Sequence, residues 1–209
     1  MRRNRPSAGR SVSEMTEISV LEGARNSALQ SIGRNVVAFQ KMEGMLKFLV
    51  ANHKIQGLPE RLAEIREEQR LGVDRLTMGN LVDKLFRSVV VDKSGRTREP
   101  DDTEGDASFS FSVELEAEDH SDTREAFQLL VQERNALIHQ MLVGFNPNSL
   151  ESCHEISGIL ADQRDRLKPH YEYLRGVVRT VLDGQKELLA WIESDDFPRA
   201  LAEVQNDAD

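Results

Sequence analysis

A chain of 209 residues is long enough for one ordinary domain with a hydrophobic core, or for two small ones. Hydrophobic residues make up 39% of it and charged residues 30%, a balance typical of globular and not of disordered proteins. The formal net charge of −9 argues against a protein that coats nucleic acid non-specifically, because basic residues supply that affinity. A local basic site remains open, since net charge does not report how the charges are distributed.

The single cysteine, Cys153, excludes an intrachain disulfide, and the absence of a CxxC or Cys/His cluster argues against zinc. No apolar run approaches the roughly 20 residues that span a bilayer. The basic N-terminus is followed by no apolar signal-peptide core. We therefore expect a protein of the reducing cytoplasm with no membrane association, no metal and no cofactor.

The first 14 residues carry four arginines with a proline and a glycine, and we expect residues 1–14 to form a disordered basic tail. An arm that touches RNA, or a true start at Met15, are the open alternatives. From Thr16 to Asn52 apolar residues recur at three- and four-residue steps, which predicts a long helix.

Residues 56–61 read as a turn, followed by a short charged helix over 61–70. Residues 77–89 place their apolar side chains on one helical face, and Thr77 is the expected N-cap. The period then changes, because SVVVDK (88–93) and SFSFSVELEA (108–117) are strand-like. In the second stretch four apolar residues alternate with polar ones, as in a half-buried strand: Phe109, Phe111, Val113 and Leu115.

We expect these two stretches to form a small antiparallel hairpin inserted at about 89–117, with a mobile polar loop over 94–106; an irregular insertion is the alternative. Helical patterns return over 121–143 and 150–192, and Pro169 is expected to kink or split the last helix.

The sequence therefore predicts a mainly α fold, a helical bundle with long N- and C-terminal helices and a small inserted β-hairpin. We expect one domain over residues 15–195, followed by an acidic tail over 196–209.

The stretch VQERNALIHQM (131–141) departs from an ordinary amphipathic pattern. In an α-helical projection of about 100° per residue, Arg134 falls near the middle of the apolar arc. Asn135 and His139 stack at the edge of that arc, and Glu133 lies on the polar side. The arc consists of Phe127, Leu130, Val131, Leu137, Ile138 and Met141.

A guanidinium inside an apolar stripe is costly unless it is paired or hydrated. Three explanations are open. Arg134 pairs with a buried carboxylate from another helix, or it extends along the stripe into solvent. In the third, the stripe also lines a cleft or a subunit interface.

The residue types point to phosphate chemistry. Arginine binds phosphate through a planar fork of donors, and histidine exchanges protons near neutral pH. Arg134 and His139 lie about 7.5 Å apart along a helix axis, so together they could bracket one phosphodiester. Attack of a ribose 2′-hydroxyl on that phosphate needs a proton acceptor, a proton donor and a cation, and no metal. Asn135 is placed to hydrogen-bond the ring or the substrate.

ERNALIH (133–139) resembles the R-N-x(3)-H form of the Arg-x(4–6)-His motif of HEPN-domain proteins (higher eukaryotes and prokaryotes nucleotide-binding). TMGNL (77–81) is similar to a Thr-Leu/Met-Gly-x-Leu segment of several HEPN-type families. The resemblance implies a helical bundle, usually dimeric, in which the motifs of two subunits face each other in a cleft. Active members of the family are metal-independent endoribonucleases, many of them toxins or phage-defence proteins.

By this resemblance Arg134 binds and polarises the phosphate, Asn135 orients the site, and His139 is the acid and base. The insertion at 89–117 has no place in the family pattern. Arg164 and His170 match the looser motif, but Pro169 is expected to disrupt the helix there, so we prefer the first match. The remaining histidines are expected to be solvated or in turns: His53, His120 and His154.

We therefore expect a HEPN-like endoribonuclease that cleaves RNA as a homodimer, in a toxin or phage-defence setting, with an antitoxin or regulatory protein as a further candidate partner. Two alternatives stay open. One is a non-catalytic helical module that binds RNA, a nucleotide or a partner protein through the same cleft. The other is a purely structural bundle in which Arg134 is ion-paired in the core.

Overall fold

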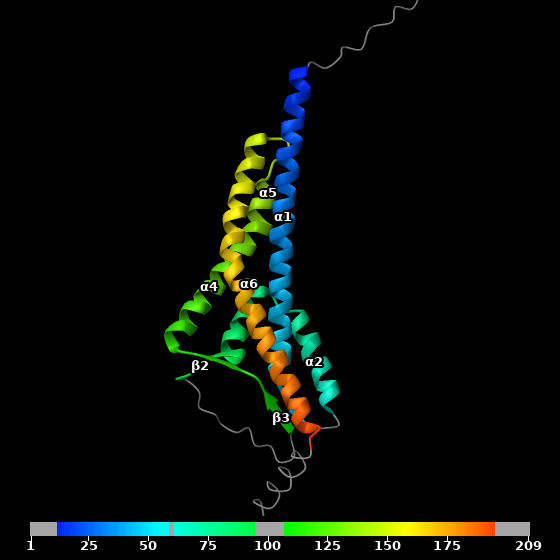
Figure 1. The fold of residues 1–209 in the computed structure, drawn as a ribbon, viewed down its shortest axis with the longest axis vertical. Helices are drawn as coiled ribbons and strands as arrows, with labels where there is room; N and C mark the ends of the chain where they lie inside the picture. Colours follow the sequence, from blue (N-terminus) through cyan, green and yellow to red (C-terminus); the bar gives the residue numbers. More distant parts are fainter. Residues whose placement is uncertain (1–11, 59–60, 95–106, 195–209) are drawn as a thin grey trace, which may run out of the picture. The chain divides into compact units, whose positions relative to one another are not determined.

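The computed structural model describes residues 12–58, 61–94 and 107–194 (Figure 1). The predicted mainly α fold, with long first and last helices and a small β insertion, is confirmed. The predicted tails fall outside these ranges except for residues 12–14, which are helical. In chain order the elements are α1 (Val12–Asn52), β1 (Lys54–Gly57), α2 (Leu62–Asp74), α3 (Met78–Lys84), the π-helix η2 (Leu85–Val89), β2 (Val90–Asp92), β3 (Ala107–Ser110), β4 (Val113–Leu115), α4 (Ala117–Ala136), the π-helix η3 (Leu137–Met141), α5 (Leu142–Gly144) and α6 (Leu150–Ile192).

The chain divides into two compact units. Unit 1 takes its residues from Met1–Phe39 and Gln132–Lys168, and unit 2 from Gln40–Val131 and Pro169–Asp209. The residues of α1, α4 and α6 are divided between the two units. The expectation of a single domain over 15–195 stays a prediction.

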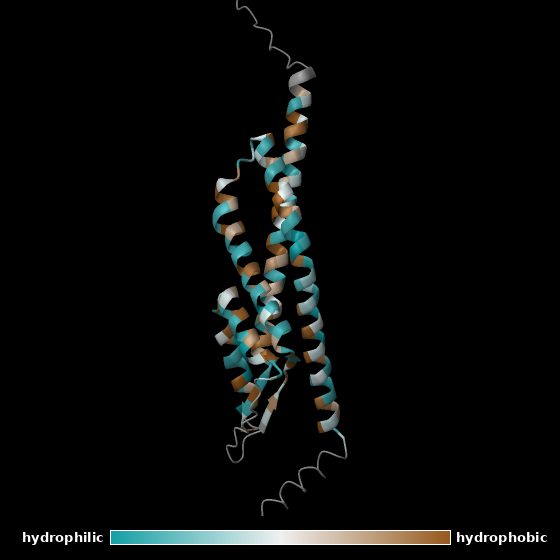
Figure 2. Cartoon of the chain, turned by 90° about the vertical axis from the view of Figure 1, so that its left-hand side faces the viewer, coloured by the Kyte–Doolittle hydropathy of each residue, from teal (hydrophilic) through white to brown (hydrophobic). Residues whose placement is uncertain are grey.

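Unit 1 is built from the apolar faces of helices. Its buried apolar residues recur at helical spacing, and Figure 2 shows hydrophobic and hydrophilic residues alternating along the long helices. Two polar side chains, Asn35 and Gln163, are buried among them at 1% and 3% exposure. The buried apolar residues of unit 1 are Ala24, Ala28, Phe39, Leu137, Cys153, Ile156, Leu160 and Leu167.

Unit 2 buries a larger apolar set that includes aromatic rings. Phe127 is fully buried, and its ring centroid lies 5.6 Å from that of Phe86 and 6.0 Å from that of Tyr173. Tilted and edge-on packing of this kind is favourable for aromatic rings. The largest aliphatic members of this core, all essentially inaccessible, are Met42, Leu46, Leu49, Leu81, Leu85 and Leu174.

The strands of unit 2 pair differently from the expected antiparallel hairpin. β3 pairs in antiparallel fashion with β1, where Ile55 lies opposite Phe109. β2 pairs with β4 in parallel, where Val91 lies opposite Glu114. The alternation in 108–117 predicted one strand, whereas the structure has two short ones, β3 and β4, with Phe111 between them; alternation also carries no information about which strand is the partner. The expected loop over 94–106 lies outside the described residues except for Ser94.

α6 continues through Pro169, so of the two expected effects, a kink or a split, the split does not occur. Proline removes one backbone N–H and crowds the preceding turn, which normally ends or bends a helix. Here Pro169 is exposed, and Leu167 and Leu174 on either side of it are buried at 2% and 0% exposure. Packing of these neighbours offsets the local cost of the proline.

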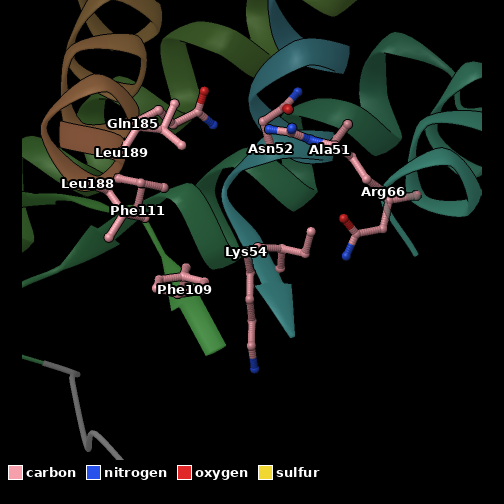
Figure 3. A pocket seen from close by; sticks show the side chains of 11 residues that line it. Ala51, Asn52, Lys54, Arg66, Phe109, Phe111, Gln185, Leu188 and Leu189 are labelled. Atoms are coloured by element: carbon pink, nitrogen blue, oxygen red, sulfur yellow. The ribbon is translucent and has the colours of Figure 1, made fainter. Parts of the chain in front are cut away.

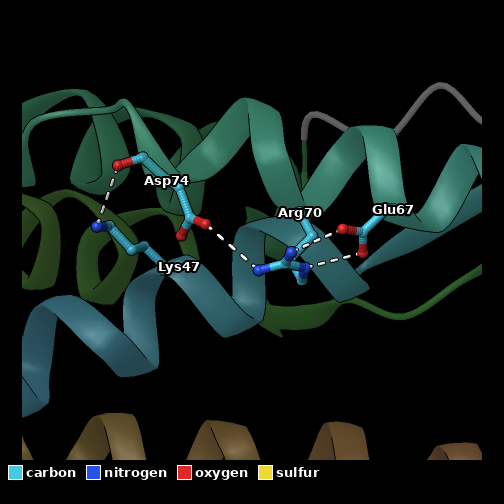
Figure 4. A network of polar contacts seen from close by, with 4 residues as sticks. All are labelled: Lys47, Glu67, Arg70 and Asp74. Carbon is cyan, nitrogen blue, oxygen red and sulfur yellow. Dashed lines mark hydrogen bonds and ion pairs between the residues drawn. The ribbon is translucent and has the colours of Figure 1, made fainter.

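A polar cluster fastens the end of α2 to the second part of α1 within unit 2 (Figure 4). The Lys47 Nζ donates to the backbone carbonyl of Asp74 at 3.3 Å, at the end of α2 where cations are favoured. Arg70 donates to both carboxylate oxygens of Glu67, at 2.6 and 2.9 Å. This hydrogen bond lowers the pKa of Glu67 and raises that of Arg70. The expected N-cap is confirmed at α3, where the Thr77 hydroxyl accepts from the Asn80 N–H at 3.3 Å.

Candidate functional site

The Arg134, Asn135 and His139 motif lies in unit 1 at the junction of α4 and η3. Arg134 and Asn135 belong to the last turn of α4, and His139 is the middle residue of the π-helical turn. The Leu142 N–H donates to the Leu137 carbonyl, a spacing of five residues. π-Turns within α-helices are rare and frequently occur at functional sites.

The π-turn changes the geometry expected from a regular α-helix. In an α-helix residues four apart lie above one another, whereas in a π-turn the hydrogen-bonded residues are five apart. The stacking expected for Asn135 and His139 therefore does not carry over unchanged. Arg134, in α4, and His139, in the π-turn, are five residues apart in the chain, the spacing that the expected phosphate site uses.

The three motif residues differ in exposure. Asn135 and His139 are exposed, and Arg134 is half-buried. Leu137, between them in the chain, is completely buried and anchors the turn to the core of unit 1. The motif is thus held by a core residue while its polar groups remain accessible to solvent.

The Arg134 guanidinium bonds to its neighbour and not to an acid. Its Nη1 donates to the Asn135 Oδ1 at 3.2 Å. Among the residues that the structure describes, no carboxylate lies within ion-pair distance of Arg134, in contrast to Arg166 and Arg175. Its positive charge is therefore not neutralised by a described residue. The ion-paired explanation of Arg134 finds no partner there, and the solvent-reaching and cleft-lining explanations remain.

Glu133 takes a different place from the one expected on the polar side. It is half-buried, and its Oε1 accepts from the Arg166 Nε at 2.6 Å. This hydrogen bond raises the pKa of Arg166. The Glu133 Oε2 is buried and has no hydrogen-bond partner in the described part of the chain. Glu133 thus joins α4 to α6 directly beside Arg134.

A buried amide pair extends this connection to α1. The Gln163 Nε2 donates to the Glu133 carbonyl at 3.3 Å, and its Oε1 accepts from the Asn35 Nδ2 at 2.9 Å. Asn35 also donates to the Leu160 carbonyl at 2.9 Å. Buried polar groups that are bonded in this way fix how helices pack, because leaving one unpaired is costly. The network holds the backbone one residue before Arg134.

Sequence reasoning missed Asn35 and Gln163. Asn35 follows Arg34, but no histidine lies at the motif spacing after this pair, so the pair does not match the motif. A signal was available, since Asn35 lies three residues after Ile32 and four before Phe39, on the apolar stripe of α1. A polar residue on such a stripe predicts a buried hydrogen bond.

A surface hollow in unit 1 is lined by Met141, the residue two positions after His139. It has a volume of about 220 Å³ and lies in unit 1 between the η3–α5 segment and the first part of α6. Met141, the last residue of η3, lines it together with Phe145 and Ile159. An aromatic and aliphatic surface therefore lies two residues beyond His139.

The other histidines have structural surroundings, with one exception. The His120 Nε2 lies 3.0 Å from the Phe86 carbonyl and 3.1 Å from that of Val90, so the expectation of a solvated residue was wrong. The His53 Nδ1 lies 2.9 Å from the Val50 carbonyl just after α1, and burial lowers the pKa of His53. His154 is exposed, as expected.

The second match to the loose motif also changes character. Its rejection rested on a helix break at Pro169, and α6 does not break there. The ring centroid of His170 lies 5.4 Å from that of Phe127 in an edge-on contact, inside unit 2. Arg164 belongs to unit 1. The packed ring of His170, and not a helix break, now distinguishes this pair from the exposed motif.

Comparison of the chain with models of protein families, with curated protein sequences and with solved structures found no match. Over the described ranges, no helix combines the length and apolar character that a membrane crossing requires. The same ranges hold no group of three or more His, Cys, Asp or Glu side chains placed to bind a metal ion. The TMGNL segment forms the start of α3, where Met78 and Leu81 are buried in the core of unit 2.

Proposed function

We propose that the protein is a HEPN-like, metal-independent endoribonuclease whose site is formed by Arg134, Asn135 and His139. One observation carries the proposal: an exposed histidine on a π-turn lies five residues after an arginine that no described carboxylate neutralises. A half-buried cation of this kind is suited to a phosphate group. The network through Glu133, Gln163 and Asn35 holds the α4 backbone next to Arg134.

The proposed reaction is an internal transesterification. The ribose 2′-oxygen attacks the adjacent phosphorus, and the bond from phosphorus to the 5′-oxygen breaks. The products are a 2′,3′-cyclic phosphate and a 5′-hydroxyl. A neutral His139 accepts the 2′-hydroxyl proton, and a protonated His139 of a second copy donates a proton to the leaving oxygen. Arg134 stabilises the charge that develops on the phosphate oxygens, and Asn135 keeps the guanidinium oriented.

The test is cleavage of a short RNA by purified protein in the presence of a chelator. Wild type is expected to release a 2′,3′-cyclic phosphate and to leave a 2′-O-methyl version of the same oligonucleotide intact. His139→Ala and Arg134→Gln should each lower the rate by about 100-fold or more. His154→Ala removes an exposed histidine of the same unit and should cleave like wild type. Equal cleavage by wild type and His139→Ala would refute the proposal.

A non-catalytic binding module is the second candidate, and one observation favours it. In the described part of the chain, no hydrogen bond or ion pair orients the His139 ring, whereas catalytic histidines are commonly oriented by a second group. This candidate expects RNA to be retained in a mobility-shift assay by wild type and lost in Arg134→Gln, with no cleavage product in either. For the ribonuclease, a toxin setting would be read from growth arrest on expression, relieved by His139→Ala.

A further inference from the structure

Unit 2 holds a pocket that the proposed ribonuclease site does not use. It has a volume of about 240 Å³ and is lined by residues from the end of α1, β1, α2, β3 and the last part of α6 (Figure 3). All of these residues belong to unit 2, whereas the motif around Arg134 belongs to unit 1. The pocket combines three kinds of surface: an apolar wall, a buried amide acceptor and an arginine.

The apolar wall consists of aromatic and aliphatic side chains. Phe109 and Phe111 come from the alternating stretch, and Leu188 and Leu189 come from α6. Figure 3 shows these four side chains gathered on one side of the pocket and Arg66 on the other. Leu189 is 59% exposed, so part of the wall is open to solvent.

Gly184 allows this wall to form. A Cβ atom added at Gly184 would lie 3.0 Å from the Phe111 Cε1 and 3.1 Å from its Cδ1. The phenyl ring therefore lies directly against the α6 backbone, which places it at the edge of the pocket. The close approach uses the one residue type that has no side chain at that point.

The second surface is a side-chain oxygen, the Gln69 Oε1, that has no hydrogen-bond donor among the described residues. Gln69 lines the pocket, and its Oε1 is buried without a hydrogen-bond partner among the described residues. A buried carbonyl oxygen without a donor destabilises the protein, so such atoms point to a missing partner. Gln69 also lines a neighbouring cavity of about 340 Å³ beside His53, so the donor must be shown to come from the pocket described here.

The third surface is cationic. Arg66, in α2, and Lys54, in β1, both line the pocket. Arg66 is exposed and forms no ion pair within the described ranges, although Arg61 and Arg70 on the same helix do. A cation without an ion pair beside an apolar wall favours an anionic ligand over a neutral one.

We propose that this pocket binds a small amphipathic carboxylate that carries one N–H or O–H donor, of which an N-acyl amino acid with an apolar side chain is the simplest form. The side chain lies against the Phe109 and Leu188 wall. The amide N–H donates to the Gln69 Oε1, and the carboxylate accepts from Arg66. This inference does not depend on the ribonuclease proposal, because the two sites share no residue.

The test is calorimetric titration of the full chain with N-acetyl-L-phenylalanine and two matched analogues. The C-terminal amide lacks the carboxylate, and the N-methyl form lacks the N–H donor. Wild type is expected to bind the parent acid about tenfold more tightly than either analogue. Arg66→Gln should lose the preference for acid over amide, and Gln69→Leu should lose the preference for N–H over N-methyl.

Arg75→Gln is the matched control for Arg66→Gln. It removes the same charge from an exposed arginine next to α2 that lines none of the cavities described above, and it should bind like wild type. Failure of wild type to bind the parent acid at millimolar concentration would overturn the proposal. The proposal would also be overturned if Arg66→Gln and Gln69→Leu both lost both preferences equally. Arg66 would then have no specific effect on the carboxylate, and Gln69 none on the N–H donor. RNA cleavage should be unchanged in all three variants.

Discussion

At the scale of single residues, His53 links the stability of unit 2 to pH. Its Nδ1 lies 2.9 Å from the Val50 carbonyl, and the ring is partly buried. Burial disfavours the imidazolium ion, which lowers the pKa of His53 below its ordinary value of 6.5, and the neighbouring Lys54 and Lys84 act in the same direction. The unfolded chain therefore takes up a proton at a higher pH than the folded chain does.

We predict that the free energy of unfolding falls as the pH is lowered below 6.5, the ordinary pKa of histidine, toward the depressed pKa of the folded protein. Above that pH the ring is neutral in both states and the full stability is present. Thermal unfolding of wild type and His53→Gln at pH 7.5 and pH 5.5 measures the effect. The variant should show a smaller loss between the two pH values. An identical loss in both proteins would show that other groups cause it.

The candidate site shows which residues a sequence can disclose. Arg134, Asn135 and His139 lie within six residues of one another, so the sequence alone shows them as a candidate site. Asn35 and Gln163 are 128 positions apart, and only the packing of α1 against α6 in unit 1 brings them together. Glu133 was assigned to the polar side because a projection of one helix contains no information about its neighbours. The residues that hold the site in place could therefore be identified only from the structure.

At the scale of elements, helices were predicted well and strand partners were not. Periodicity reports which face of an element is buried, so α1, α3 and α6 appeared near their observed places. It does not report the partner of a strand, so the pairing of β1 with β3 was missed. The π-turn η3 was also missed, because the same residues give an acceptable α-helical pattern. An extra residue in a turn is decided by packing, here by the buried Leu137.

The second prediction concerns Pro169 in α6. It lies inside the uninterrupted α6 and is exposed, so its ring contributes little packing. Proline in a helix interior is about 3 kcal/mol less favourable than alanine. We predict that Pro169→Ala raises the free energy of unfolding by about 1 to 3 kcal/mol, because it restores one backbone hydrogen bond. Urea denaturation followed by circular dichroism measures this.

Lys168→Ala is the control for that measurement, since it changes the neighbouring exposed position without touching the backbone hydrogen bonds. It should shift the urea midpoint very little. A loss of stability in Pro169→Ala would mean that α6 needs a bend at this point, and that the proline supplies it. The sequence-based expectation of a kink would then be correct in substance, although the helix does not split.

At the scale of the whole molecule, the proposed reaction needs two copies of the chain. One His139 serves as base and a second as acid, and a two-fold interface is the common way to bring identical motifs together. An exposed apolar residue lies close to the motif in the sequence: Val143 of α5 is 81% exposed and follows His139 by four residues. If the reaction needs a second copy, Val143 is a residue at which an interface can be tested.

We predict that the protein is a dimer and that Val143→Glu makes it monomeric, because a carboxylate at the interface would lose hydration without gaining a partner. Sedimentation velocity reports the mass, and circular dichroism confirms that the variant is folded. RNA cleavage should fall with dimerisation, and the specific activity of wild type should rise with protein concentration. Leu71→Glu, which places the same charge at a 50% exposed leucine of α2 in unit 2, should remain dimeric and active. A fully active monomer would mean that one copy of Arg134, Asn135 and His139 suffices, and that the second proton carrier comes from within the chain or from water.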